Sequence, residues 1–167
     1  MRSVYAIRRT KQRGFTLVEI LIVVIILGIL AAIVIPQFTN ASQDARKSSL
    51  TSQLQTIRSQ VELYKLQHQD KLPDVVNSWQ ILTQKSNVFG TVTSAGSFGP
   101  YLQQIPTNPL NNATLVMNGN GTASPTGSNG WVYDYSGGSG TGKFWATGSV
   151  TTMFFNEGNG LDAATVN

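Results

Sequence analysis

Glu19 is the residue whose position most clearly suggests chemistry, because it is the one charged residue in the long apolar stretch 15–38. A carboxylate inside a membrane segment costs about 2.5–3.5 kcal/mol on insertion scales, and such residues usually have a function. A cation beside the carboxylate would offset that cost. Glu19 is therefore expected either to pair with a cation or to lie close enough to the headgroups to reach water.

The remaining polar residues show no pattern that is typical of an enzyme. We find no paired acids with a plausible cleft, no nucleophile elbow and no phosphate-binding loop. The glycine-rich run 136–142 lacks the lysine of a P-loop, and the sequence contains no cysteine. His68 has no second histidine or carboxylate pair near it that would make a metal site. We predict that the protein has no catalytic residues and is not an enzyme.

Positive charge is concentrated at the N-terminus. Five of the twelve Lys and Arg residues precede Phe15, whereas the chain from Phe15 onward carries seven basic and eight acidic residues. A nucleic-acid-binding protein is expected to carry its positive charge in the folded domain, so we predict no nucleic-acid partner. The basic N-terminus instead predicts a cytoplasmic N-terminus and an exported C-terminal bulk.

The apolar stretch 15–38 is long enough to cross a bilayer. As a helix it would measure about 36 Å, against about 30 Å for the hydrocarbon core. An ordinary secretory signal fits less well, since its apolar region is shorter and is followed by a small-residue cleavage site. A plain signal anchor remains an alternative. Pro36 should kink or loosen the helix, because proline lacks an N–H and clashes with the preceding turn.

The run "RGFTLVEILIVVIILGILAAIVIP" (13–36) resembles the N-terminal signature of type IV pilins and type II secretion pseudopilins. The resemblance implies a basic leader, residues 1–14, that a prepilin peptidase removes between Gly14 and Phe15, followed by N-methylation of Phe15. It also implies that Glu19 guides filament assembly by pairing with the N-terminal amine of a neighbouring subunit. An α-amino group has an ordinary pKa of about 7.7–8.0 and is largely cationic at neutral pH, so the pair is physically reasonable.

The helical pattern continues beyond the apolar stretch. Apolar residues recur every three or four positions and form one stripe of an amphipathic helix: Leu50, Leu54, Ile57, Val61, Tyr64 and His68. We predict one helix from about Phe15 to about Gln69. Residues 15–38 would be the transmembrane or filament-core helix, and residues 39–167 a periplasmic head that includes the amphipathic half. His68 is interpreted as an ordinary helix-end residue.

The predicted head combines this helix with a small sheet. Pro73 should end the first helix, a short second helix is expected within 75–86, and strands are expected at 114–117, 131–135, 143–148 and 151–155. Residues 100–112 resemble the tyrosine–hydrophobic–Pro–x–x–Pro loop of the secretion pseudopilin head. The predicted fold class is α+β, with one long N-terminal helix packed on a small antiparallel sheet, which is the pilin fold.

Together these features identify a type IV pilin-like protein, most like the major pseudopilin of type II secretion systems. The resemblance implies a structural subunit of a helical filament that drives protein export, anchored in the inner membrane by a single span before assembly and periplasmic afterwards. Implied partners are further copies of the chain, the prepilin peptidase, an inner-membrane assembly platform with its ATPase, minor pseudopilins and membrane lipid. The alternatives are a type IV pilus subunit for adhesion, motility or DNA uptake, a membrane-anchored binding module that does not polymerise, and a signal-anchored enzyme.

A calcium site is the one cofactor that the resemblance raises, because many secretion pseudopilins carry one near the C-terminus. The candidate ligands here are Glu157 and Asp162. Calcium takes six to eight oxygens and usually several carboxylates, whereas this tail offers two. The dense aspartate run of the family is missing, and Leu110 stands where the family usually has a tryptophan. We predict no cofactor, with calcium at Glu157 and Asp162 as the alternative.

Overall fold

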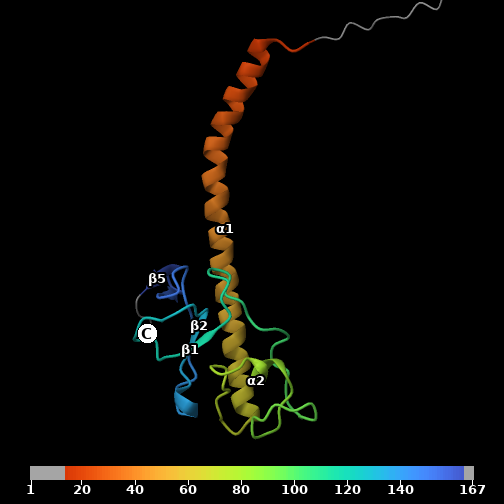
Figure 1. Ribbon diagram of the computed structural model, residues 1–167, viewed down its shortest axis with the longest axis vertical. Coiled ribbons are helices and arrows are strands. Elements are labelled where there is room, and N and C mark those ends of the chain that lie inside the picture. The colour runs from red at the N-terminus through yellow and green to blue at the C-terminus, as the bar shows by residue number, and fades with distance from the viewer. Residues whose placement is uncertain (1–13, 164–167) are drawn as a thin grey trace, which may run out of the picture. The chain divides into compact units, whose positions relative to one another are not determined.

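The computed structural model describes residues 14–163, apart from the side chain of Leu161. Contacts divide the chain into two units, residues 1–42 and 43–167. The elements are α1 (Leu17–Gln67), α2 (Gln80–Thr83), β1 (Val116–Asn118), β2 (Trp131–Tyr133), the 3-10 turn η1 (Ser136–Gly138), β3 (Phe144–Ala146), β4 (Phe154–Asn156) and β5 (Leu161–Ala163). Figure 1 labels α1, α2, β1, β2 and β5. The predicted basic leader, residues 1–14, lies outside the described residues except for Gly14.

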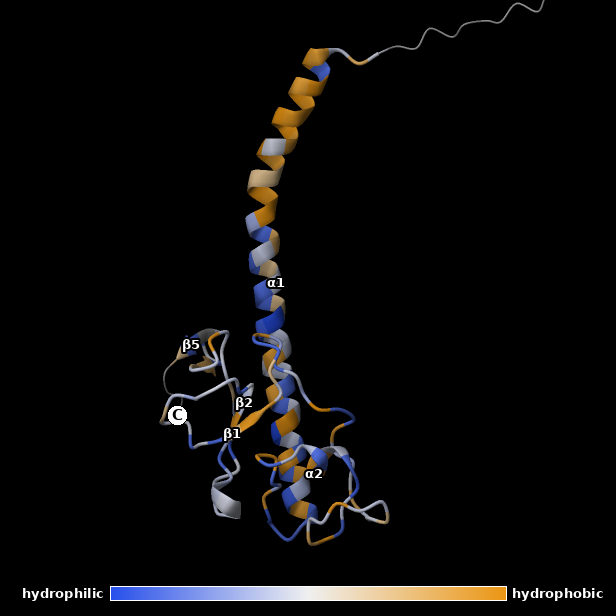
Figure 2. Cartoon of the chain, viewed as in Figure 1, coloured by the Kyte–Doolittle hydropathy of each residue, from blue (hydrophilic) through white to orange (hydrophobic). Residues whose placement is uncertain are grey.

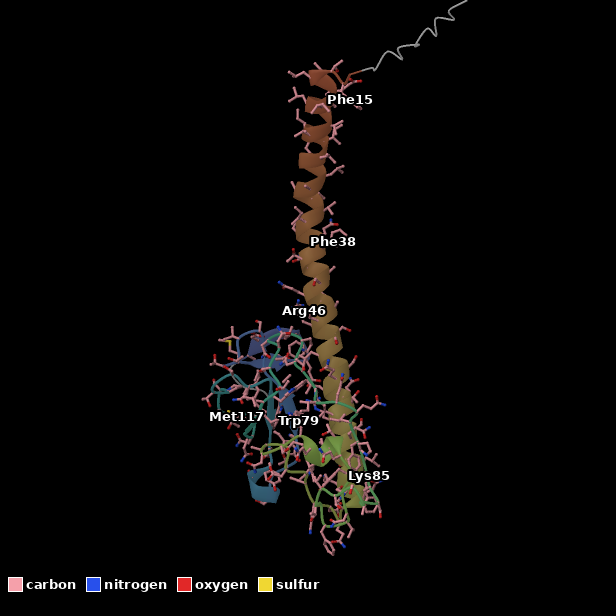
Figure 3. The ribbon with its side chains drawn as sticks, turned by 45° about the vertical axis from the view of Figure 1, so that its right-hand side comes forward. Phe15, Phe38, Arg46, Trp79, Lys85 and Met117 are labelled. Carbon is pink, nitrogen blue, oxygen red and sulfur yellow. The ribbon has the colours of Figure 1, made fainter. Side chains whose placement is uncertain are left out.

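The first unit contains the N-terminal part of α1, in which residues 20–35 are apolar on every side. Figure 2 shows it almost uniformly hydrophobic, and the side chains between Phe15 and Phe38 project outward from the helix (Figure 3). Phe15 is 83 % exposed and even Val34 is 40 % exposed. Among the described residues, α1 is the helix long and apolar enough to cross a bilayer, and the protein buries none of its most apolar stretch. A helix that is apolar all round needs lipid or other helices around it.

Pro36 lies inside α1, which continues through it without interruption. Three residues later, the Thr39 hydroxyl donates to the carbonyl oxygen of Ile35 at 3.2 Å. Such a bond from Thr to the preceding turn often accompanies a bend. The kink itself stays a prediction.

The second unit is built on the amphipathic half of α1. The predicted stripe is confirmed, since Leu50, Leu54, Ile57, Val61 and Tyr64 are all buried in the main core. The helix ends at Gln67, slightly earlier than expected, and Gln69 and Asp70 then take left-handed conformations, each with φ near 59°. A left-handed residue after the last turn stops a helix, so Pro73 is not the residue that ends α1.

His68 is more than the ordinary helix-end residue that the sequence suggested, because it is completely buried. Its ring stacks on that of Tyr64 with 3.8 Å between centroids. Its Nδ1 lies 2.9 Å from the Tyr64 carbonyl oxygen and its Nε2 lies 2.9 Å from Ser86 Oγ. His68 therefore joins the end of α1 to the segment that follows α2.

The strands form two small sheets that complete the predicted α+β pilin fold. The first has the order β1-β2-β3 and the second pairs β4 with β5. The expected antiparallel arrangement holds for β2–β3 and β4–β5, but β1 and β2 are parallel, with Val116 opposite Trp131. Residues 119–130 return the chain to the end of the sheet at which β1 begins, as a parallel pair of strands requires. Strand β5 was not predicted.

Both faces of the three-stranded sheet are covered. Trp131 and Tyr133 of β2 belong to the core that contains the α1 stripe, and they share a face because alternate side chains of a strand do. Val132 points to the other face, where it packs with Trp145 and Phe154 in a second, smaller cluster. An isolated bridge between Thr147 and Phe154 connects the two sheets at this point.

Helix α2 is shorter than the predicted segment 75–86. Two side chains ahead of it bond to nearby backbone: Asp74 accepts from the Asn77 N–H at 3.2 Å, and Ser78 Oγ accepts from the Gln80 N–H at 3.1 Å. Such local bonds favour turns over helix. They explain why residues 75–77 form a turn and helix begins only at Gln80.

The predicted loop 100–112 has no helix or strand, and a buried asparagine holds it. Asn108 is completely buried, and its Nδ2 donates to the carbonyl oxygens of Gly130 and Thr147 at 2.9 and 2.8 Å. Its Oδ1 accepts from the Leu110 N–H at 2.9 Å. One side chain thus ties the loop to the ends of β2 and β3.

Candidate functional site

The N-terminal candidate site is the start of α1, where Thr16 and Glu19 cap the helix reciprocally. Thr16 Oγ1 accepts from the Glu19 N–H at 3.2 Å. The Glu19 carboxylate accepts from the Thr16 N–H at 2.9 Å and from the Thr16 hydroxyl at 2.8 Å. This is a capping box, which satisfies backbone donors that a helix start leaves unpaired. The Thr-x-x-Glu pattern of residues 16–19 signals it, although the sequence analysis did not use that signal.

Gly14 and Phe15 lie immediately before this cap. Both are exposed and both precede the first helical residue, Leu17, so the peptide bond between them is outside the helix. Exposed backbone without helical hydrogen bonds is where proteases cut most readily. The structure thus brings Gly14, Phe15 and Glu19 together at one end of α1, while Pro36 lies farther along the same helix.

The charge at this site is unbalanced. Residues 14–42 contain Glu19 and no Lys or Arg, so the described part of the first unit supplies no cation for the carboxylate. Within residues 14–163 its side chain bonds to Thr16, and both bonds use the same oxygen, Oε2. The other oxygen has no hydrogen bond to these residues. An ammonium group is the kind of donor that would also neutralise the charge.

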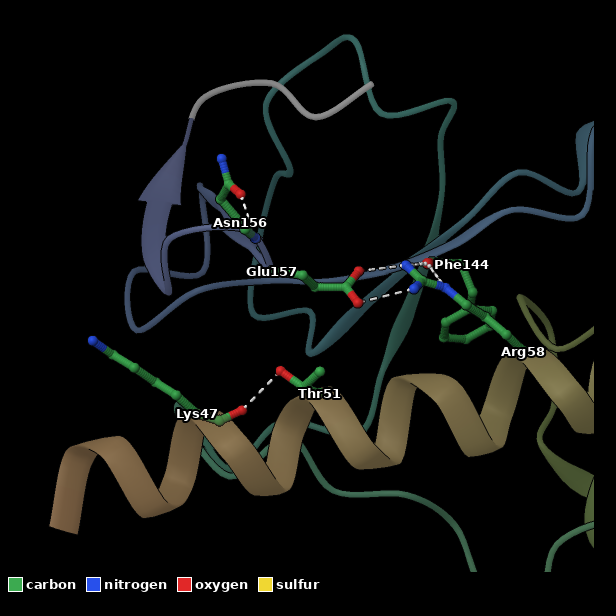
Figure 4. A network of polar contacts seen from close by, with 7 residues as sticks. Lys47, Thr51, Arg58, Phe144, Asn156 and Glu157 are labelled. Carbon is green, nitrogen blue, oxygen red and sulfur yellow. Dashed lines mark hydrogen bonds and ion pairs between the residues drawn. The ribbon is translucent and has the colours of Figure 1, made fainter. Parts of the chain in front are cut away.

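The two predicted calcium ligands lie in the second unit and have different partners. Glu157 is paired with Arg58 of α1, at 2.7 Å between Oε1 and Nη2 and 3.0 Å between Oε2 and Nη1 (Figure 4). Asp162 accepts from the backbone N–H groups of Ser149 and Val150 at 3.2 and 3.1 Å and from the Ser149 hydroxyl at 2.7 Å. Across the residues that the structure describes, no three His, Cys, Asp or Glu side chains gather in a way that could hold a metal ion.

A groove of about 690 Å³ lies beside the Arg58–Glu157 pair. Its lining comes from α1, β3 and the turn after β4, and includes Glu62, Lys143 and Trp145. The lining also includes Phe144, Phe155 and Thr141, whose hydroxyl donates to the Asp134 carboxylate at 2.6 Å.

Comparison with known proteins assigns both parts of the chain. Residues 9–35 match the family described as "Prokaryotic N-terminal methylation motif", and residues 37–141 match "Type II secretion system (T2SS), protein G". The type II secretion system core protein G of Klebsiella michiganensis is 32% identical over 102 residues, which are 61% of this chain and 70% of that protein. The protein of the same name from Pseudomonas aeruginosa is 32% identical over 105 residues, 63% of this chain and 72% of the relative.

A relative with a different name matches a shorter part of the chain at higher identity. The prepilin peptidase-dependent protein D of Escherichia coli K12 is 49% identical over 61 residues, 35% of this chain and 40% of that protein. No solved structure matches the chain. The protein G family covers residues 37–141, well over half of the sequence, and the methylation motif adjoins it at residue 35. This chain, with an exposed apolar helix at one end and an α+β head at the other, belongs to the protein G family of type II secretion systems.

Proposed function

We propose that this protein is a structural, non-catalytic subunit of the type II secretion pseudopilus, a filament built from copies of the same chain. The observation that carries the proposal is the apolar half of α1, which is exposed on all sides and begins with a lone carboxylate. Lipid can cover the apolar surface, but the described part of the first unit has no Lys or Arg that could supply a cation to Glu19. A bundle of identical helices would provide both.

Processing is the first step of the proposed mechanism. A prepilin peptidase would hydrolyse the Gly14–Phe15 peptide bond, releasing residues 1–14 and creating an α-amino group on Phe15, which is then N-methylated. The match of residues 9–35 to the methylation motif supports this step, as does the similarity to a relative named as prepilin peptidase-dependent. A methylated amine still accepts a proton and stays cationic at neutral pH.

The membrane stage follows from the charge distribution. The five basic residues before Phe15 would hold the N-terminus in the cytoplasm, residues 15–38 would span the inner membrane, and the head would lie in the periplasm. Assembly then moves the apolar helix from lipid into the filament core. The energy for that movement would come from the ATPase of an inner-membrane assembly platform, and minor pseudopilins would be further partners.

Glu19 would set the position of each new subunit. In the single chain its carboxylate is held by Thr16. In the filament it would bond to the Phe15 amine of a neighbouring subunit, and in that low-dielectric environment the pair offsets the cost of burying two charges. The growing filament would then push exported cargo outward.

Two variants of Glu19, a control variant and one mass measurement test the proposal. Glu19→Ala and Glu19→Gln should be processed and inserted normally but should fail to assemble. The control, Glu62→Gln, removes an exposed acid of the same helix and should assemble like the wild type. Cross-linking of intact cells reports assembly, and N-terminal mass analysis should find a chain that starts at methylated Phe15. Full assembly of Glu19→Ala would refute the role of Glu19, and an intact Met1 or a start near Ala32 would refute the processing step.

A further inference from the structure

Arg58 joins three elements that are distant in the sequence. It projects from α1, and its Nε and Nη2 donate to the Phe144 carbonyl oxygen of β3 at 2.9 and 2.6 Å. Its Nη1 and Nη2 donate to the two carboxylate oxygens of Glu157 at 3.0 and 2.7 Å. Figure 4 shows the guanidinium lying between the strand and the acid. All three of its nitrogens are therefore used.

Glu157 is the first residue of the turn between β4 and β5. That two-stranded sheet is attached to the rest of the head by one isolated bridge, Thr147 to Phe154, by the bonds of Asp162 to residues 149 and 150, and by the packing of Phe154 and Phe155. The pairing with Arg58 adds a charged attachment at its turn. A bidentate guanidinium–carboxylate pair fixes direction as well as distance, which a single ammonium contact does not.

The residues present do not fit the calcium site that the family resemblance raised. A calcium ion needs six to eight oxygens, usually with several carboxylates. Both oxygens of Glu157 are bonded to Arg58, and both oxygens of Asp162 are bonded to residues 149 and 150. All eight acidic residues of the sequence lie within the described part of the chain, and no three of them come together there.

We propose that the Arg58 guanidinium is the structural cation of this head, and that it fixes the β4–β5 sheet to α1 without calcium. A guanidinium is charged at every physiological pH and is part of the chain, so its attachment does not depend on the concentration of a free ion. The proposal concerns the folding of the head alone. It is independent of filament assembly, so failure of one leaves the other intact.

The first test measures whether calcium changes the stability of the full chain in detergent. The three tryptophans, Trp79, Trp131 and Trp145, all lie in the head, so their fluorescence reports its unfolding and not that of the apolar helix. The thermal midpoint should be the same in calcium at about 1 mM, where many extracellular calcium modules bind, as in excess EGTA. A ligand that binds only the native state raises the midpoint, so a rise with calcium would overturn the proposal.

The second test removes the guanidinium. Arg58→Ala should lower the thermal midpoint by roughly 3–8 °C, and Arg58→Lys should recover only part of that loss, because an ammonium cannot make both bidentate contacts. The matched control is Lys65→Ala, which breaks the exposed pair with Glu62 on the same helix and should leave the midpoint unchanged.

Hydrogen exchange locates the effect. In Arg58→Ala the backbone amides of residues 154–163 should exchange several-fold faster, while those around Leu54 on α1 should change little. Calcium should not restore the midpoint of this variant, since a single freed carboxylate cannot complete a site. An Arg58→Ala midpoint equal to that of Lys65→Ala, or full restoration by calcium, would overturn the assignment of Arg58.

Discussion

Replacing Asn108 with alanine should be among the most damaging polar substitutions in the head. The side chain is completely buried and makes bonds of 2.8–2.9 Å to Gly130, Thr147 and Leu110. Each such bond contributes about 1 kcal/mol net, so their loss removes about 3 kcal/mol. The Gly130 carbonyl keeps a bond from the Thr147 N–H, whereas the Thr147 carbonyl has no other partner within residues 14–163. Leaving that oxygen unpaired adds about 1 kcal/mol or more.

The expected loss of about 4 kcal/mol is a large part of the 5–15 kcal/mol that stabilises a typical domain. It is measured by urea denaturation followed by tryptophan fluorescence, which gives the free energy of unfolding of the head. Asn111→Ala is the matched control. Asn111 also makes three bonds, to Thr147, Gly148 and Ala113, but it is only partly buried, so water can replace them. Its loss should be about 1 kcal/mol.

A third variant sharpens the test. Asn108→Asp keeps the acceptor for Leu110 but turns the donor into an oxygen that faces the carbonyls of Gly130 and Thr147, so it should destabilise the head at least as much as alanine does. The result would be contradicted if Asn108→Ala lowered the free energy of unfolding no more than Asn111→Ala does, or if Asn108→Asp left it unchanged. Burial would then not be the reason that the Asn108 hydrogen bonds stabilise the head.

Three further substitutions test other parts of the head. Hydrogen bonds from the side chain and backbone of Thr141 hold the pKa of Asp134 below its ordinary value. The ionised Asp134 therefore stabilises the folded head above about pH 4, and this stabilisation is lost as the pH falls further. The urea midpoints of the wild type and Asp134→Asn should differ above pH 4 and converge below it. Leu54→Ala, at a completely buried position of the α1 stripe, should cost about 2–5 kcal/mol in urea denaturation, and a cost under about 1 kcal/mol would contradict the observed packing. Gly130→Ala should cost about 1–3 kcal/mol, because the new Cβ would overlap the backbone carbonyl of Ala113, whereas Gly158→Ala would meet only the end of a side chain and should unfold like the wild type.

Local patterns in the sequence account for what was predicted correctly. The α1 stripe repeats every three or four residues, and a helix translates that spacing directly into one buried face. In β2, Trp131 and Tyr133 lie in the core that contains the α1 stripe and Val132 lies on the opposite face, as the period of two of a strand requires. The parallel pairing of β1 with β2 could not be predicted, because it depends on the path of residues 119–130 and has no signal in either strand.

The functional residues divide in the same way. Phe15 and Glu19 stand out because their types and spacing are unusual next to an apolar run. The Thr16–Glu19 cap could also have been predicted, from the Thr-x-x-Glu pattern of residues 16–19. Arg58 looks like an ordinary solvent-facing residue of an amphipathic helix. Its partners Phe144 and Glu157 are 86 and 99 residues away, so only the folded chain brings them together.

The position of the capping box has a consequence for maturation. Both of its members, Thr16 and Glu19, lie on the C-terminal side of the predicted scissile bond, so none of the hydrogen bonds that begin α1 would leave with the leader. The precursor and the mature subunit would share one pre-shaped helix end. Cleavage would thus create a new α-amino group near a carboxylate that the cap already orients. The start of α1 would not have to refold before the subunit could join a filament.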